Sequence, residues 1–244
     1  MPKSPKTQTA KRPNAQTPNP PKPPAAKRAK TSPAKAPKKR SIYGVHPGVK
    51  MVADWIESLP SKTGRSLQQW VSLVRAEGPE DEKGRREWLK EMHGFGTNAA
   101  WWIAERSVGK GLHDGDPDMY LKEAEKYLVE MYAGGKAGLK PIHDALIDAA
   151  AELGDDVKAC PCQTIVPLYR NHVFAQIKPS TKTRIDLGLA LAKFEGKLPA
   201  RLIDTGGKAK GDRITHRIPI TKLDEIDDEV KQWLKVAYDL DQRY

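Results

Sequence analysis

The spacing of apolar residues predicts a series of short helices directly after residue 40. The first apolar face repeats at i, i+3, i+4 and i+7, and it consists of Val49, Val52, Ala53 and Ile56. Pro60 is expected to end this helix, because proline lacks the backbone N–H that a helix interior needs. A second helix is predicted over about 66–77, where Ser66 and Gln69 have the spacing of a capping box.

Two more helices complete a predicted bundle. Trp88, Leu89 and Met92 mark the third helix, and the fourth is expected to begin after Thr97 as its N-cap. Gly94 between them is interpreted as the residue that closes the third helix, and the alternative is a glycine turn that binds phosphate through its amides. Five of the six tryptophans fall in this region and are expected to form most of its core: Trp55, Trp70, Trp88, Trp101 and Trp102.

In the second half of the chain the apolar period changes from that of a helix to that of a strand. Helical stripes run over 120–131 and 139–153. From Val157 onward the period is two, most regularly over 185–191, which predicts an antiparallel sheet. A final helix is predicted over about 226–241.

Together these patterns predict an α+β chain in three parts. Residues 1–40 are expected to form a disordered tail, 41–112 a small helical bundle, and 115–244 an antiparallel sheet flanked by helices. No apolar run approaches the roughly 18 residues that a membrane span needs. Cys160 and Cys162 are too close in sequence for an unstrained disulfide. We therefore expect a cytoplasmic protein with no membrane contact.

Charge is divided unevenly between the tail and the rest of the chain. Residues 1–40 contain twelve Lys and Arg and no Asp or Glu, whereas the remaining residues carry 30 basic and 31 acidic side chains. Prolines favour an extended chain, which can follow a polyphosphate backbone and release its counterions. We expect non-sequence-specific binding of DNA or RNA, with nucleoid association as an option. The assigned contacts are Lys27, Arg28, Lys30, Lys35, Lys38, Lys39 and Arg40.

Two other interpretations of the tail stay open. It is also compatible with a solubilising linker, and in a eukaryotic host its basic cluster is compatible with a nuclear address.

Short motifs in both folded parts resemble those of bacterial domains. The run PSTKTRIDLGL at 179–189 resembles a widespread bacterial domain of unknown function, and KTGxSLxxW at 62–70 resembles the small helical domain that often precedes it. The tail resembles those of linker histones in composition. The resemblance implies a helical module followed by an α+β domain, and it brings no established activity.

A polar cluster is predicted on one face of the hairpin around the turn at 179–182. Strand alternation separates the leucines of the second strand from Arg184, Asp186 and Gly188, which share the opposite face. One interpretation is an anion or ligand site, and the alternative is a wet sheet face with cross-strand ion pairs. The candidate residues are Lys178, Ser180, Thr181, Lys182, Arg184 and Asp186.

Two segments resemble metal-binding patterns without the full ligand set. The acidic run 114–118 begins like a calcium loop, but the glycine at the sixth position is missing, and an N-cap followed by Pro117 in the first helical turn accounts for the run. Cys160 and Cys162 form a single pair where a structural zinc site needs four spaced ligands. No catalytic residue, metal or cofactor is assigned.

Three functions remain open at this point. The first is tail-mediated nucleic-acid binding, the second is a small-ligand-binding protein or enzyme that uses the polar hairpin cluster, and the third is a protein-interaction scaffold. A defined cleft that holds the cluster favours the second function, and a large exposed apolar patch on the helical module favours the third. The oligomeric state is not predicted.

Overall fold

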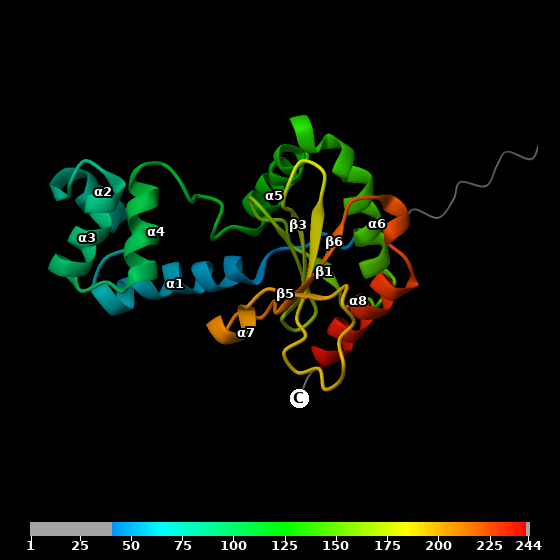
Figure 1. Cartoon of the computed structure of the whole chain (residues 1–244). Coiled ribbons are helices and arrows are strands. Elements are labelled where there is room, and N and C mark those ends of the chain that lie inside the picture. The colour runs from blue at the N-terminus through cyan, green and yellow to red at the C-terminus, as the bar shows by residue number, and fades with distance from the viewer. Residues whose placement is uncertain (1–40, 243–244) are drawn as a thin grey trace, which may run out of the picture. The chain divides into compact units, whose positions relative to one another are not determined.

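The computed structural model describes residues 41–242, and Figure 1 shows the course of the chain. The predicted tail and its seven assigned contacts lie outside the described residues. The first four helices are α1 (Pro47–Thr63), α2 (Leu67–Glu77), α3 (Glu82–His93) and α4 (Thr97–Ser107). None of the helices within 41–242 is long and apolar enough to cross a membrane.

The second half of the chain contains a sheet and its flanking helices. The elements before the sheet are α5 (Pro117–Met131), the 3-10 helix η1 (Gly134–Leu139) and α6 (Lys140–Ala151). The strands are β1 (Lys158–Ala159), β2 (Val166–Tyr169), β3 (Val173–Pro179), β4 (Ile185–Leu189), β5 (Ile203–Asp204) and β6 (His216–Ile220). The remaining helices are α7 (Gly207–Lys210), η2 (Leu223–Glu225) and α8 (Asp228–Leu240). The α+β prediction is confirmed.

Local capping signals define the helix ends largely as predicted. Ser66 Oγ accepts the N–H of Gln69, whose side chain accepts the N–H of Ser66, so the capping box of α2 is confirmed. Gly94 has a left-handed φ of 69° at the end of α3, which confirms that it closes this helix. Asp116 caps α5, and Pro117 stands in its first turn as predicted.

Two helix boundaries differ from the prediction. The expectation that Pro60 ends α1 is wrong, because the helix continues to Thr63 and ends at the left-handed Gly64. Pro60 falls in the last turn, where the missing N–H removes only one hydrogen bond of the helix. The N-cap of α4 is Gly96 and not Thr97, which is already helical.

The core of the helical bundle is mainly aliphatic, so the expectation that tryptophans form most of it is wrong. Trp70 is buried, but Trp101 is 45% exposed and the other three tryptophans are half-buried. Small residues on α4 let it pack closely against α2 and α3, which leaves room for few large rings. The buried cluster consists of Leu59, Trp70, Val71, Val74, Leu89, Ala100, Ile103 and Ala104.

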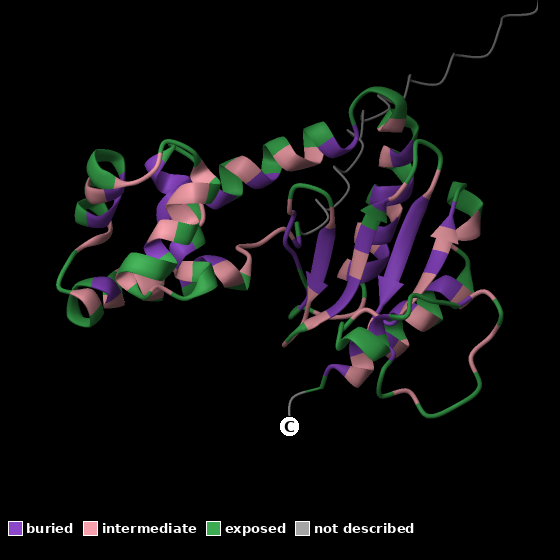
Figure 2. Cartoon of the chain, turned by 60° about the vertical axis from the view of Figure 1, so that its left-hand side comes forward, coloured by how far each residue is buried: buried purple, intermediate pink, exposed green. Residues whose placement is uncertain are grey.

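The sheet is antiparallel with the strand order β1-β2-β3-β4-β6-β5. One face packs against α6 and α8, and Figures 1 and 2 show these helices beside strands that are largely buried. The central strand β4 is buried along its whole length. The largest fully buried side chains of this core include Phe174, Leu168 and Ile177. The opposite face carries no helix of this core and is the face on which the polar residues lie.

The segment before α1 lies against the edge of the sheet. Ile42 belongs to the sheet core, and Tyr43 forms a parallel bridge with Ala159 of β1. The N–H of Gly44 donates to the carbonyl oxygen of Ala159 at 3.0 Å. These contacts bring His46, the N-cap of α1, next to the open face of the sheet.

Candidate functional site

Strand register brings the predicted polar cluster together on the open face of the sheet. Lys178 of β3 pairs with Asp186 of β4, and Gln176 pairs with Gly188. On the other side of β4, Gly188 pairs with Arg217 of β6. The predicted placement of Arg184, Asp186 and Gly188 opposite the leucines of β4 is therefore confirmed for Asp186 and Gly188, which belong to that strand.

Asp186 is the anionic centre of this face. Its carboxylate accepts a hydrogen bond of 2.9 Å from Arg217 Nη1, and Arg184 Nε lies 3.0 Å from the same oxygen, Oδ1. The Arg184 contact is an ion pair without hydrogen-bond alignment at Nε, although its Nη2 donates to Oδ2 at 3.4 Å. The Asp186 side chain is only 12% exposed, so its charge is compensated by the two arginines and not by water.

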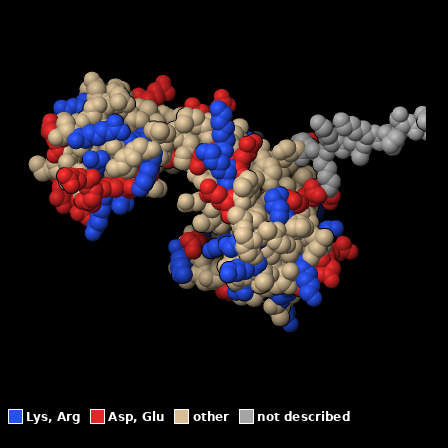
Figure 3. Space-filling model, turned by 90° about the horizontal axis from the view of Figure 1, so that it is seen from above, with Lys and Arg blue, Asp and Glu red and all other residues tan. Residues whose placement is uncertain are grey.

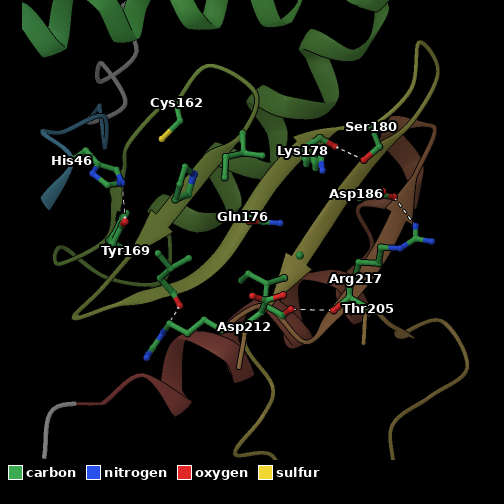
Figure 4. A pocket seen from close by; sticks show the side chains of 16 residues that line it. His46, Cys162, Tyr169, Gln176, Lys178, Ser180, Asp186, Thr205, Asp212 and Arg217 are labelled. Carbon is green, nitrogen blue, oxygen red and sulfur yellow. Dashed lines mark hydrogen bonds and ion pairs between the residues drawn. The ribbon is translucent and has the colours of Figure 1, made fainter. Parts of the chain in front are cut away.

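Glycine at position 188 makes room for a side chain from the neighbouring strand. A Cβ atom there would lie 2.8 Å from Gln176 Cγ and 2.7 Å from Ile214 Cγ2, closer than real carbon contacts. With hydrogen in that place, Gln176 lies over β4 and reaches the middle of the open face (Figure 4). Gly188 of the sequence motif thus leaves space above β4 for the Gln176 side chain.

These residues line a cavity of about 660 Å³ above the sheet (Figure 4). This volume is in the range of small-molecule sites in proteins. Lys178, Ser180, Asp186 and Arg217 line one part of the cavity. Among the described residues Lys178 forms no ion pair, whereas each arginine beside it is held by Asp186.

A histidine and a tyrosine from distant parts of the chain form another part of the wall. His46 Nδ1 accepts the N–H of Gly48 at 2.9 Å, and His46 Nε2 lies 2.9 Å from the hydroxyl oxygen of Tyr169. Burial lowers the pKa of His46, which favours neutral imidazole. Since Nδ1 accepts a hydrogen bond, the neutral ring carries its proton on Nε2. The Nε2–H group therefore donates a hydrogen bond to the Tyr169 oxygen, and the Tyr169 O–H is free to donate to a ligand.

Tyr169 is a hydrogen-bond donor and not a base. Burial and the nearby thiols Cys160 and Cys162 raise its pKa to about 12. Its hydroxyl therefore keeps its proton at neutral pH. Figure 4 shows Tyr169 and His46 together at one side of the cavity.

The six predicted ligand residues are not all brought together. Lys178, Ser180 and Asp186 line the cavity, and Arg184 reaches it through Asp186. Lys182 lines a neighbouring cavity instead. The Thr181 hydroxyl accepts the N–H of Thr183 within the turn, so it serves the turn itself.

Sequence reasoning missed Arg217, His46 and Tyr169. Arg217 is part of the Thr-His-Arg run at 215–217, but its partner lies 31 residues away and only the β4–β6 pairing identifies it. His46 and Tyr169 are 123 residues apart. No local spacing in the sequence signals either contact.

Cys160, considered above as a zinc ligand, and the histidines His172 and His216 have other partners. Cys160 is buried, burial raises the pKa of its thiol to about 12, and its sulfur lies 3.7 Å from the carbonyl oxygen of Val45. His172 pairs with Asp241, and His216 Nδ1 lies 3.0 Å from the Thr215 hydroxyl. Within residues 41–242 no group of three or more potential metal ligands comes together.

Comparison with known proteins gives two matches, both to domains. Residues 52–106 match a family model described as a domain of unknown function, DUF4287, and residues 129–241 match a second domain of unknown function, DUF5655. No curated protein and no solved structure matches the chain. The first match covers the helical bundle from α1 to α4, and the second covers the sheet with its helices. The two matches in series fit the two-module arrangement that the resemblance implied.

Proposed function

We propose that the α+β domain binds a small anionic molecule in the cavity on the open face of its sheet. The observation that carries this proposal is a cavity of about 660 Å³ that holds part of the predicted polar cluster, with Lys178 on its wall and Asp186 and Arg217 on its floor. A concave site with a few convergent polar groups is the usual form of a small-molecule site.

The charges of the cavity favour an anion. Asp186 compensates one of the two arginines that contact it, so the group of Arg184, Asp186 and Arg217 retains one positive charge. Lys178 adds a second charge beside it. Asp212 also lines the cavity, next to Thr205 (Figure 4), and so does Arg213, whose charge is paired with Asp241. A ligand with an anionic end and a hydrogen-bonding body fits this arrangement.

The test is ligand-observed NMR on the full chain with three matched sets of probes. The members of each set share a body and carry a phosphate, a carboxylate or no charge: phenyl phosphate, benzoate and phenol; glucose 6-phosphate, glucuronate and glucose; AMP, adenosine 5′-carboxylate and adenosine. Gln176→Trp fills the cavity from its floor, and Gln232→Trp is the matched control on the exposed side of α8. We expect at least one anionic probe to bind and to lose binding in Gln176→Trp alone.

A variant that fails to fold does not decide this experiment, so folding is followed by thermal melts. Tyr169→Phe removes only a hydroxyl from the same cavity and is expected to weaken the bound probe while leaving the fold intact. If no probe binds in a manner that depends on Gln176 or Tyr169, the proposed function is wrong.

A second function is supported by the charge of residues 1–40. Twelve basic and no acidic residues there contrast with 30 basic and 31 acidic residues in the remainder, whose charges are interspersed on the face seen in Figure 3. We propose that this segment binds DNA or RNA without sequence preference, by neutralising phosphates and releasing counterions. Exchange of its seven assigned residues for Gln in the full chain is expected to weaken binding of a duplex of mixed sequence, and unchanged affinity would contradict the proposal.

A further inference from the structure

A second cavity adjoins the one on the sheet face. It has a volume of about 600 Å³ and lies at the end of β3, between the turn that follows this strand and the segment around η1. Lys178 and Ser180 line both cavities. A molecule bound over the sheet therefore has an adjoining space at the Lys178 end.

Three lysines line this second cavity. They come from three different segments: Lys136 from η1, Lys178 from β3 and Lys182 from the turn between β3 and β4. Glu130 is the one carboxylate among its lining residues. None of the three lysines forms an ion pair with a carboxylate of residues 41–242, so the cavity has an excess of positive charge.

Two of the lysine side chains contact the neighbouring segment. Lys136 Nζ donates a hydrogen bond of 2.8 Å to the carbonyl oxygen of Pro179, the residue next to Ser180. Gly135 leaves space for the stem of Lys182, since a Cβ atom at Gly135 would lie 3.1 Å from Lys182 Cδ. The segment around η1 and the turn after β3 are thus packed against each other through these two lysines.

Like charges gathered at one place repel each other unless an anion neutralises them. Carboxylates elsewhere in this protein supply that neutralisation, as Asp186 does for two arginines. Here the protein provides three ammonium groups, with the hydroxyls of Ser180 and Thr164 beside them. A phosphate monoester suits such a site better than a carboxylate does, because it carries nearly two negative charges and three acceptor oxygens.

We propose that the ligand of the sheet cavity is a phosphorylated small molecule, whose phosphate lies among Lys136, Lys178 and Lys182 while its body lies over Gln176. This inference rests on the proposed function and adds the chemical class of the ligand. The oxygens of the phosphate accept hydrogen bonds from the ammonium groups, and no covalent step is involved.

The test uses the three probe sets at pH 8, where phosphate monoesters are dianions. The site variant combines Lys136→Gln, Lys178→Gln and Lys182→Gln in the full chain. The matched control combines Lys62→Gln, Lys90→Gln and Lys231→Gln, which removes the same charge from exposed positions elsewhere. We expect the phosphate member of at least one set to bind best, and its Kd to rise at least tenfold in the site variant and less than twofold in the control.

Each other outcome overturns the inference in a distinct way. Probes that bind in a Gln176-dependent manner, but equally well as carboxylates or equally well in the site variant, leave the proposed function standing and refute the phosphate site. Equal losses of affinity in the site and control variants would mean that phosphate binding depends on the total charge of the chain, and would also refute the phosphate site. Absence of any Gln176-dependent binding contradicts both the proposed function and this inference.

Discussion

His143 of α6 is completely buried between two tyrosine hydroxyls. Its Nε2 lies 2.9 Å from the Tyr43 hydroxyl, and its Nδ1 lies 2.9 Å from the Tyr132 hydroxyl. A neutral imidazole offers one donor and one acceptor, so one tyrosine accepts from it and the other donates to it. Through Tyr43 this histidine holds the segment before α1 against the sheet domain.

The stability of the fold should depend on pH through this histidine. Burial, with a smaller effect from Lys140, lowers the pKa of His143 from 6.5 to about 4, while Asp144 acts in the opposite direction. The unfolded chain binds a proton at a higher pH than the folded chain does, so stability present above pH 6.5 is lost as the pH falls to 4. The expected loss is about 3 kcal/mol.

Denaturant unfolding of the wild-type chain and His143→Gln between pH 4 and 7 measures this effect. The variant loses the contacts of the ring with the two tyrosines, so its unfolding free energy should be below that of the wild type at pH 7. Because the variant has no titrating ring at this position, the difference should shrink by about 3 kcal/mol at pH 4. Parallel pH profiles of the two chains would contradict this interpretation of His143.

Glu105 at the end of α4 gives the opposite pH dependence. Glu105 is only 7% exposed. Burial and the nearby carboxylate of Asp114 raise the pKa of Glu105 to about 7, while Arg106 acts in the opposite direction. The folded state therefore favours the protonated acid, and its stability declines as the pH rises from 4.5 through 7. Glu105→Gln keeps a neutral polar group at this place.

We expect Glu105→Gln to be more stable than the wild type at pH 8 and equally stable at pH 5, as measured by thermal melts. Asp54→Asn, which opens the exposed Lys50–Asp54 pair, serves as the control and should not change with pH in this range. A variant that is less stable than the wild type at pH 8 would show that the Glu105 charge is favourable in the fold.

At the residue scale, the sequence predicts which side chains share a face but not which distant groups meet there. Alternation along β4 places Asp186 and Gly188 together, and the register confirms it. The contact of Arg217 with Asp186 depends on the pairing of β4 with β6. The contact of His46 with Tyr169 depends on the position of the segment before α1. These are consequences of tertiary structure that no local period encodes.

At the scale of single elements, the start of α2 depends on its capping box. The Ser66 side chain accepts the N–H of Gln69 at 3.3 Å, and the returning bond from the N–H of Ser66 to Gln69 Oε1 is 2.8 Å. Ser66→Ala should reduce the unfolding free energy by about 1 kcal/mol, because backbone N–H groups of the first turn lose their acceptor. Ser61→Ala within α1 is the control and should have little effect, since alanine is the better helix former.

The ion group of Arg184, Asp186 and Arg217 should contribute more to the unfolding free energy than an exposed ion pair does. Asp186→Asn leaves two guanidinium groups without their carboxylate on the face of a buried strand, with an expected loss of about 2 kcal/mol in denaturant unfolding. Asp54→Asn on the surface of α1 should lose at most about 0.5 kcal/mol. Equal effects of the two substitutions would mean that the Asp186 group is no better insulated from solvent than a surface pair.

Element types were predictable from periodicity, whereas boundaries and core composition were less so. The period-two region became the sheet and the capping box fixed the start of α2, because these signals are local. Pro60 did not end α1, since a proline in the last turn removes a single hydrogen bond. The tryptophans are less buried than expected because the packing of α4 on its neighbours uses alanines.

At the scale of the whole molecule, charge is divided unevenly along the chain. The formal charge of +11 arises from +12 in residues 1–40 and −1 in the rest, where 30 basic and 31 acidic residues nearly cancel. We propose two independent ways in which this chain binds phosphate. One is the proposed attraction of residues 1–40 for a polyanion, and the other is the proposed phosphate site beside Lys178. The two differ in their response to salt, because many weak contacts release many counterions.

Salt titration of duplex binding by the full chain separates these contributions. If about half of the twelve charges meet phosphates, the slope of log affinity against log salt should be near −5, and exchange of the seven assigned residues for Gln should reduce it to about −2. The Lys136, Lys178 and Lys182 variant should leave the slope almost unchanged, because the proposed cavity site binds a single phosphate group. A slope that falls with the cavity variant and not with the tail variant would assign duplex binding to the sheet domain, and would overturn the division of roles between the two parts of the chain.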